Sequence, residues 1–404
     1  MKKLSESQTY KVQVLILQGA IISFLFGFFM IANISLIAFA LLWVFDKNIG
    51  QKIKIAFSNV HVWLFASYFL LTLIGFSYSE NLKVAGKFLE MRMTMFLLPI
   101  VLSTITLKDA QLKNILLTFC FGTVGALILG LGYSTYLFLD TGDSGYFFND
   151  NLTILLDNKG AYFALYVNIA VVILLFQLKE KPKQVWVYAI LIMLFVFQLL
   201  LATRISIATL FLILVCAIVY IVKNYKSKTV YGIVAAVAMV SVIGLVAMPQ
   251  TVNRFKSMLS SYQYDFENPN DVNHFNADEI KKENWNGLTL RLALWECGTR
   301  VIKDHFWVGV GTGDYDKVFR EEIEEVNFIY AQKHDFGVHN QYLYTWISFG
   351  VVGVIIFLLA TLLLLLDALK RKNFLFIGIV FVFAVVFLTE NVLNRYLGIL
   401  PHSL

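Results

Sequence analysis

The sequence predicts an all-α polytopic membrane protein with about 11–12 transmembrane helices and one large polar loop. Of its 404 residues, 58% are hydrophobic and only 15% are charged, whereas soluble domains average about 45–50% apolar and about 25% charged residues. The apolar residues gather into runs of roughly 17–25 residues, the length that a helix needs to cross about 30 Å of hydrocarbon. A transmembrane β-barrel would show shorter segments of alternating hydrophobicity, so the runs favour a helical bundle.

The charge and cysteine content argue against several other classes of protein. The net charge of +6 does not indicate nucleic-acid binding, because the lysines lie in short loops between the apolar runs. The three cysteines are divided between two apolar runs and the polar loop, so they indicate no disulfide framework. The first apolar run is too long for a signal peptide and lacks a small-residue cleavage pattern, which indicates an uncleaved first span.

The candidate spans follow one another along the chain, and the first two are separated only at Asn33. They predict an N-terminal bundle of about nine spans in residues 1–248, a large loop in 249–340 and further spans in 341–404. The expected spans are residues 13–31, 33–45, 59–77, 85–104, 113–138, 159–177, 185–202, 205–222, 229–248, 341–366 and 374–390.

Lysine and arginine mark one side of the predicted bundle. Every second loop is basic, as in residues 47–54 and 370–372. The alternate loops include the acidic stretch 140–157, the turn at Arg204 and the whole 249–340 segment. Since cytoplasmic loops are enriched in lysine and arginine, the large loop is expected on the outer face.

Within the large loop, residues 288–303 are expected to form a helix. Their apolar residues recur at helical spacing and predict one buried face, made of Leu290, Leu294, Cys297 and Val301. Arg291 and Trp295 are i, i+4 neighbours on an adjacent face. Residues 251–286 are polar and expected to be irregular, and an acidic helix is expected at about 314–333.

Three arginines on the predicted outer face are candidates for binding an anion: Arg204, Arg291 and Arg300. A guanidinium offers planar, bidentate donors that match a phosphate or pyrophosphate. Arginines at span ends also extend to lipid headgroups without further function, and for Arg204 both interpretations stay open. Arg291 lies in an apolar helix beside Trp295, which headgroup anchoring explains less well, whereas Arg300 is expected to be solvated or structural.

His339 lies where the loop meets a span and is followed by Asn340. A neutral imidazole titrates near about pH 6.5 and takes a proton from a hydroxyl at working pH, so His339 is a candidate general base. The alternative is an interfacial histidine bonded to the backbone. The spacing of His334, Asp335 and His339 matches no strong metal signature, so no metal ligands and no cofactor are expected.

Three further features have a functional and a structural interpretation. The glycines at 309–313 resemble a nucleotide loop, but the βαβ context is missing and a turn between helices is expected. Arg92 lies inside a predicted span, where charges are costly and often functional, so it is a secondary candidate for the anion. Glu390, at the outer end of the last span, is expected to orient an arginine or the histidine, or else to cap a helix end.

The order of these motifs resembles the O-antigen ligase and polysaccharide polymerase family over about residues 286–360. The family pattern is an arginine and a tryptophan on a helix, a Gly-x-Gly turn, a His-Asn pair and a glycine-punctuated span. Here these are Arg291 and Trp295, Gly309-Val310-Gly311, His339-Asn340, and Gly350-Val351-Val352-Gly353. The chain departs from the common family layout because it shows no clear final span.

The resemblance implies a metal-independent, GT-C-like glycosyltransferase of the bacterial inner membrane, with residues 249–340 on the periplasmic face. It would take a glycan from undecaprenyl-pyrophosphate among the membrane lipids and transfer it to a hydroxyl on lipid A–core. By resemblance, Arg291 and Arg204 would bind the pyrophosphate, and His339 would act as base or orient the acceptor.

Other functions stay open at this point. A polymerase would use the same donor but a growing glycan as acceptor, and a protein O-oligosaccharyltransferase would use a protein hydroxyl. A small-molecule transporter is a different class, and internal repeats with ionisable residues near the bilayer centre would indicate it. No repeat is visible in the sequence, and its charges lie mostly at span ends.

Overall fold

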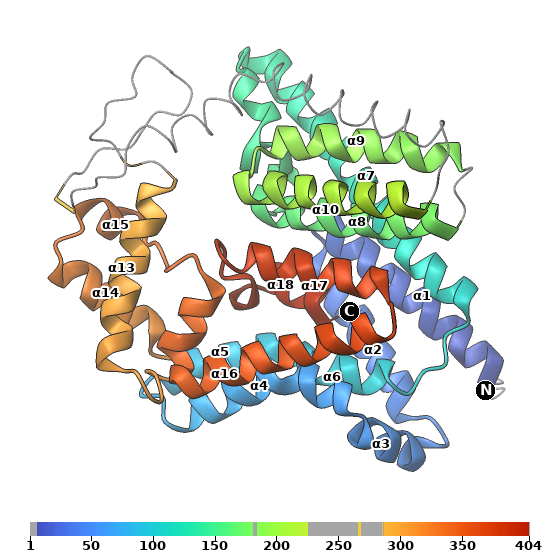
Figure 1. Ribbon diagram of the computed structural model, residues 1–404, viewed down its shortest axis with the longest axis horizontal. Helices are drawn as coiled ribbons and strands as arrows, with labels where there is room; N and C mark the ends of the chain where they lie inside the picture. Colours follow the sequence, from blue (N-terminus) through green and yellow to red (C-terminus); the bar gives the residue numbers. More distant parts are fainter. Residues whose placement is uncertain (1–5, 181–183, 225–265, 268–284, 286, 404) are drawn as a thin grey trace. The chain divides into compact units, whose positions relative to one another are not determined.

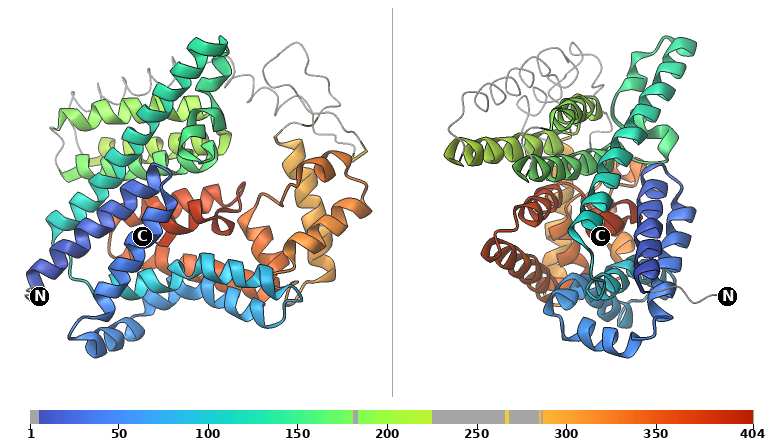
Figure 2. Two further views of the ribbon diagram at one scale, coloured as in Figure 1. Left: turned by 180° about the vertical axis from the view of Figure 1, so that it is seen from behind. Right: turned by 90° about the vertical axis from the view of Figure 1, so that its right-hand side faces the viewer.

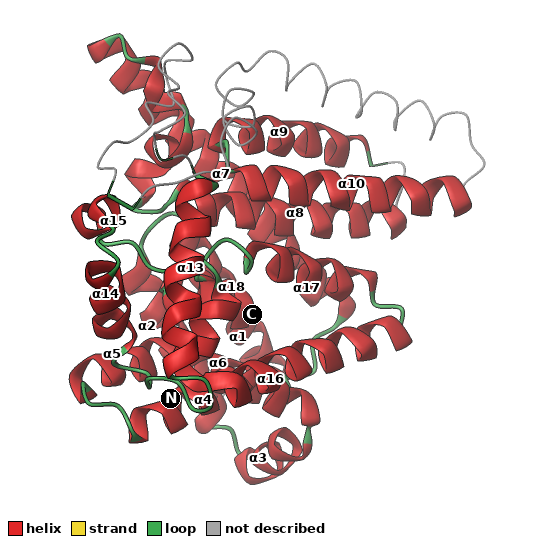
Figure 3. Cartoon of the chain, turned by 60° about the vertical axis from the view of Figure 1, so that its left-hand side comes forward, coloured by secondary structure: helices red, strands yellow, loops and turns green. Residues whose placement is uncertain are grey.

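The computed structural model describes residues 6–180, 184–224, 266–267, 285 and 287–403. Over these residues the chain forms helices and no strand (Figure 3), which confirms the all-α fold class. The helices group into two compact units. The first takes its described residues from Met1–Val62, Leu97–Gly244 and Lys372–Val382, and the second from Trp63–Phe96, Leu245–Arg371 and Phe383–Leu404.

The first unit is organised around α8 (Gly160–Glu180), whose residues are buried almost continuously from Tyr162 to Leu174. Helices packed on several sides of α8 explain why it has no polar face. Its neighbours are α7 (Asp109–Thr141), α9 (Val185–Leu201) and α10 (Arg204–Asn224), as Figure 1 shows. The remaining helices of this unit include α1 (Glu6–Leu25), α2 (Phe29–Val44) and α3 (Ile49–Ser58).

The predicted separation of the first two spans at Asn33 is wrong. Asn33 lies inside α2, and the chain instead breaks between Leu25 and Phe29. Gly27 in this break has a φ of 81°, a left-handed conformation that only glycine adopts without steric cost. α2 then meets α3 at an angle of 109°, so the second predicted span is part of a sharply bent pair.

Four helices among the described residues are long and apolar enough to cross a membrane, and the bent pair α2–α3 makes a fifth if it is one span. The four are α4 (Val60–Ser77), α7, α8 and α16 (Gln341–Lys370). Shorter apolar helices coincide with other predicted spans, among them α1, α9, α10 and α17 (Phe374–Val386). The chain is therefore a multi-pass membrane protein, whereas the total of about 11–12 spans and the division at residues 248 and 340 remain predictions.

Two other predictions meet the structure only in part. The expected span 85–104 is divided between α5 (Leu82–Arg92) and α6 (Thr94–Leu102), with Met93 between them. The predicted span 229–248 and nearly all of the irregular stretch 251–286 lie outside the described residues.

The second unit contains the helices of the large loop. The helix predicted at 288–303 is confirmed as α13 (Thr289–Asp304). The acidic helix predicted at 314–333 is instead two helices, α14 (Tyr315–Glu325) and α15 (Ile329–His334), because Asn327 between them is left-handed with a φ of 53°. Figure 2 shows these three helices, in orange, as a compact group, and α13 and α14 both pack against α16. After α17 the chain ends in a short 3-10 helix (Val392–Asn394) and α18 (Tyr396–Ser403).

Helix α16 is broken at Gly350, and the glycine-rich turn fills the break. Gly350 has φ 66° and ψ −172°, which is not helical. The carbonyl oxygens left unpaired accept hydrogen bonds from the turn: the N–H of Val310 donates to Ile347 O at 2.8 Å and that of Gly311 donates to Ser348 O at 2.9 Å. Residues 309–313 therefore form the expected turn between helices, and this turn also satisfies backbone groups that would otherwise be costly to bury.

We expect Gly350→Ala to lower the stability of the second unit. The backbone conformation at Gly350 is open almost only to glycine, and forcing another residue into it costs about 1–3 kcal/mol. The added methyl group would also overlap the carbonyl of Trp307. The thermal unfolding midpoint of the detergent-purified protein should fall, whereas Gly86→Ala in α5, where a methyl group meets no atom within 4 Å, should not lower it, since alanine favours a helix over glycine. Equal midpoints for both variants would contradict the assigned role of the break.

Candidate functional site

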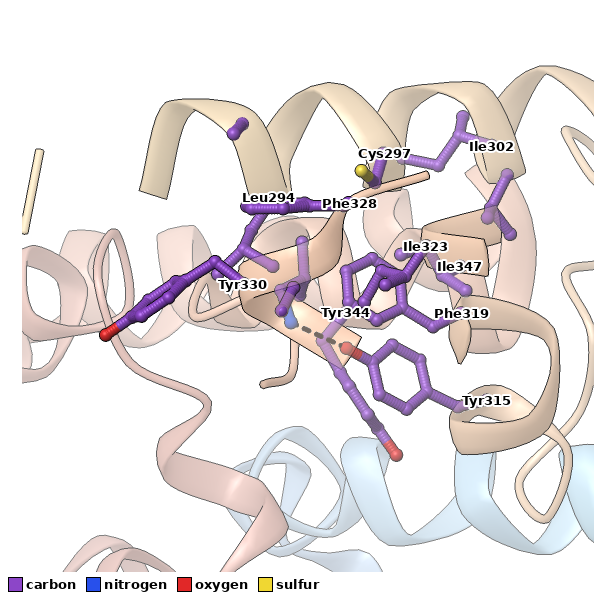
Figure 4. Packing of buried hydrophobic residues seen from close by; sticks show 14 of the residues in the cluster. Leu294, Cys297, Ile302, Tyr315, Phe319, Ile323, Phe328, Tyr330, Tyr344 and Ile347 are labelled. Atoms are coloured by element: carbon purple, nitrogen blue, oxygen red, sulfur yellow. Dashed lines mark hydrogen bonds between the residues drawn. The ribbon is translucent and has the colours of Figure 1, made fainter. Parts of the chain in front are cut away.

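The apolar face of α13 fixes this helix against α14 and α16. Leu294, Cys297 and Val301 of the predicted face are buried, and Leu290 is partly buried against the same cluster. Figure 4 shows Leu294 and Cys297 packed with residues of the neighbouring helices, including Phe319, Ile323, Tyr344 and Ile347. Burying each large apolar side chain contributes about 1.5–3 kcal/mol. This packing holds the adjacent face of α13, which carries Arg291, in one position.

Glu390 joins the two residues that the sequence singled out most strongly. Its Oε1 accepts a hydrogen bond from Arg291 Nη2 at 2.9 Å, and its Oε2 lies 3.4 Å from His339 Nδ1. The three side chains are 30%, 34% and 18% exposed for Arg291, His339 and Glu390 respectively. They come from α13, from the segment before α16 and from the segment after α17. The structure thus brings Arg291 and His339 together through Glu390, in a cluster that a solute can reach.

Arg291 is held by protein groups but keeps donors for a ligand. Its Nε donates to Thr389 O at 3.3 Å, and its Nη1 donates to Gly287 O at 3.0 Å. With the bond to Glu390, three of the five N–H donors of a guanidinium have partners within the described part of the chain. The two others have no hydrogen-bond partner among the described residues.

The ionisation of Glu390 bears on which nitrogen of His339 faces the carboxylate as a donor. Burial raises the pKa of the Glu390 carboxyl, but the hydrogen bonds and charges of His339 and Arg291 outweigh burial, and the pKa lies below its ordinary value. Glu390 is therefore an ionised acceptor at neutral pH, and in a neutral His339 ring a proton on Nδ1 would face this carboxylate. Its Nε2 then has a free lone pair, which is the arrangement a general base requires.

The backbone at His339 is held from both sides. His339 has a φ of 47°, a left-handed conformation that costs a residue with a side chain roughly 1–2 kcal/mol. The N–H of Val338 donates to the Tyr315 hydroxyl at 2.8 Å (Figure 4), and the N–H of Asn340 donates to Asn391 Oδ1 at 2.7 Å. Strained residues held in this way occur often at functional sites.

Asn340, the other half of the His-Asn pair, is used as a helix cap. Its Oδ1 accepts hydrogen bonds from the N–H groups of Tyr342 and Leu343 at 3.0 and 3.1 Å. Capping satisfies N–H groups at the start of α16 that have no partner inside the helix. Asn340 thus fixes the start of α16 beside His339.

Two other candidates on α13 have different surroundings. Arg300 makes ion pairs with Glu296 at 2.8 Å and Glu322 at 3.8 Å, and about half of its side chain is exposed. This fits the solvated role expected of it. Trp295 packs against the hydrophobic cluster, and its indole N–H is buried with no hydrogen-bond partner among the described residues.

Arg92 is fully buried and bonded within the second unit. It donates to Leu393 O, Thr72 Oγ1 and Asn394 Oδ1 at 3.1, 3.0 and 2.9 Å. The guanidinium also lies over the rings of Tyr68 and Phe88, which stabilises a cation that has no carboxylate partner among the described residues. In this state its donors hold the segment after Glu390, and anion binding by Arg92 stays a prediction.

Arg204 begins α10 in the first unit. The predicted convergence of Arg204 with Arg291 and His339 therefore stays a prediction.

As for metals, the described residues include no group of three His, Cys, Asp or Glu side chains that could hold an ion. Asp335, beside His334, pairs with Arg320 at 2.5 Å.

Two residues that position the site were not singled out from the sequence. Asn391 accepts the N–H of Asn340, and Tyr315 accepts the N–H of Val338. In the sequence, Asn391 directly follows Glu390 at the end of an apolar run, and these two adjacent polar residues could have indicated a role at the site. No local pattern indicated the role of Tyr315, because its partner Val338 lies 23 residues away in the sequence.

Residues 190–358 match the sequence model of the O-antigen ligase family. This match supports an O-antigen ligase-like family for the chain. It confirms the resemblance seen in the motifs and extends it toward the N-terminus, to a stretch that includes Arg204. Family members are glycosyltransferase-like enzymes, and a membrane function of the O-antigen ligase or polymerase family is supported for this chain. No curated protein matches the chain significantly.

We expect Glu390→Gln to lower stability most at neutral pH. The substitution leaves Arg291 and His339 without their carboxylate, at a cost of about 1–3 kcal/mol, toward the lower end because the cluster is partly exposed. The lowered pKa of Glu390 means that its contribution is present above the ordinary value of 4.5 and is lost as the pH falls through the lower folded value.

Thermal unfolding midpoints of wild type and variant should therefore differ at pH 7 and converge in acid. The matched control is Glu296→Gln, which removes the carboxylate bonded to exposed Arg300 and should change stability by less than about 0.5 kcal/mol. A Glu390→Gln deficit that does not shrink in acid would contradict this account.

Proposed function

We propose that this chain is a membrane glycosyltransferase of O-antigen ligase type. In this proposal it transfers a glycan from undecaprenyl-pyrophosphate to a hydroxyl of lipid A–core at the periplasmic face of the inner membrane. The observation that supports it most is the cluster of Arg291, Glu390 and His339, because it pairs a fixed cation with an oriented imidazole. The proposed step requires no redox or phosphate-activating chemistry, since the glycosyl–pyrophosphate bond already supplies the driving force.

The proposed step moves one proton and breaks one bond. The acceptor oxygen attacks the anomeric carbon of the donor glycan, the bond from that carbon to the pyrophosphate oxygen breaks, and undecaprenyl-pyrophosphate leaves. The acceptor proton passes to Nε2 of His339. The ring becomes an imidazolium, which the Glu390 carboxylate beside Nδ1 stabilises.

Arg291 stabilises the leaving group in this proposal. Negative charge grows on the pyrophosphate as its bond to the sugar breaks, and a fixed donor directed at that charge lowers the barrier without reorganising. The two N–H groups of Arg291 that lack described partners would make these bonds. Arg204 is proposed as a second pyrophosphate ligand through the family resemblance.

We expect His339→Ala and Arg291→Ala to abolish most surface glycan at normal protein level. Loss of a general base typically costs about 10²–10⁴ in rate, and loss of one charge-stabilising donor costs about 10²–10³. The readout is a gel of surface glycan from cells in which the variant replaces the native chain. Arg291→Lys should also be impaired, since an ammonium lacks the planar fork of a guanidinium.

The matched controls remove the same chemical groups from nearby positions. His334→Ala removes an exposed histidine from the same segment, and Arg300→Ala removes an exposed arginine from the same helix. Both should keep near-normal glycan. Normal glycan in His339→Ala and Arg291→Ala would refute the proposed catalysis.

A deletion strain distinguishes the ligase from a polymerase. Both use the same donor but differ in acceptor. Loss of polymer from lipid A–core with free polymer retained supports the ligase proposed here. Loss of chain length supports a polymerase, and loss of glycan from a protein alone supports a protein O-oligosaccharyltransferase.

A further inference from the structure

Three adjacent hydrophobic residues of the large loop are exposed. Phe306, Trp307 and Val308 are 38%, 71% and 64% exposed. They follow α13 and precede the glycine turn. Because a soluble loop seldom exposes three such side chains together, the segment indicates a surface that contacts something apolar.

The backbone of this segment is bound to the break in α16. Phe306 O accepts the N–H of Val351 at 2.9 Å and the indole N–H of Trp346 at 3.3 Å. The segment therefore lies beside Gly350. Its exposed side chains keep a fixed place along α16.

The break at Gly350 also divides α16 by environment. Before it, the helix is largely buried in protein, with Gln341, Tyr344 and Ile347 among its buried residues. After it, large apolar side chains are about half exposed, among them Val352, Ile355, Leu359, Leu362 and Leu366. From Val351 to Lys370 the helix extends roughly 30 Å at about 1.5 Å per residue, which equals the thickness of the hydrocarbon core.

A second spanning helix ends at the same level. α4 ends at Ser77, and the hydroxyl of the next residue, Tyr78, donates to Val308 O at 2.6 Å. The N–H of Thr312 donates to Gly75 O at 3.3 Å. The end of α4, the break in α16 and the exposed segment are thus joined by hydrogen bonds.

We propose that Phe306, Trp307 and Val308 form an interfacial wedge, which inserts into the outer boundary of one lipid leaflet. The membrane surface then lies at the level of Gly350 and of the end of α4, with residues 351–370 extending into the bilayer. Tryptophan and tyrosine prefer this depth, because their rings are apolar and their N–H or O–H group reaches water. The wedge holds the loop helices α13–α15 against the membrane surface.

The test measures the depth of Trp307 in vesicles of phosphatidylcholine. The purified full chain is reconstituted with lipids carrying bromine atoms either near the headgroup or near the methyl end of the acyl chains. The protein has seven tryptophans, so the Trp307 signal is the difference in fluorescence between wild type and Trp307→Phe. Trp285→Phe is the control, because Trp285 is 3% exposed within the hydrophobic cluster.

The Trp307 signal should lose a larger fraction to bromine near the headgroup than to bromine near the chain end. The Trp285 signal should be unaffected by either. A Trp307 signal that neither lipid quenches overturns the wedge, and stronger quenching by deep bromine overturns the boundary at Gly350. If Trp307→Phe does not fold, Trp307→Tyr provides the same difference with an interfacial residue retained.

Discussion

The carboxylate of Glu390 accepts from a guanidinium on one oxygen and faces an imidazole with the other, and the arrangement of the candidate site depends on this sharing. It orients His339 through Nδ1 and holds Arg291, two of whose N–H groups have no partner among the described residues. The carboxylate is ionised because its two partners outweigh the cost of burial. Without a carboxylate at this position, the guanidinium of Arg291 and the imidazole of His339 would lose their common hydrogen-bond acceptor.

Glu390 reaches this place because the segment that follows it is bound on both sides. Arg92 donates to Leu393 O and Asn394 Oδ1, and Gln341 Oε1 accepts the N–H of Leu393 at 2.8 Å. Since Gln341 begins α16 directly after His339 and Asn340, the same contacts align the histidine and the carboxylate. A buried arginine at the end of α5, expensive in isolation, is thus used to position the segment next to the site.

The break in α16 performs a second organising task. It gives the glycine turn a place to bond, and it separates a largely buried first half of the helix from a second half in which one face of large apolar side chains is about half exposed. Three loop helices are consequently tied to a spanning helix at one defined point. A lipid-linked donor presents its pyrophosphate near the membrane surface, so loop helices fixed there suit the chemistry proposed for this family.

Local patterns in the sequence determined much of this protein. Apolar runs set the helical membrane class, helical spacing located α13 and its buried face, and residue chemistry selected Arg291, His339 and Glu390. These follow from properties of single residues and of neighbours within a few positions. Only the tertiary structure decided that Glu390 serves both partners, which lie 99 and 51 residues away, that Arg92 is enclosed, and that the chain breaks at Gly27, Asn327 and Gly350. Each of these results from packing between distant segments, and no local pattern contains that information.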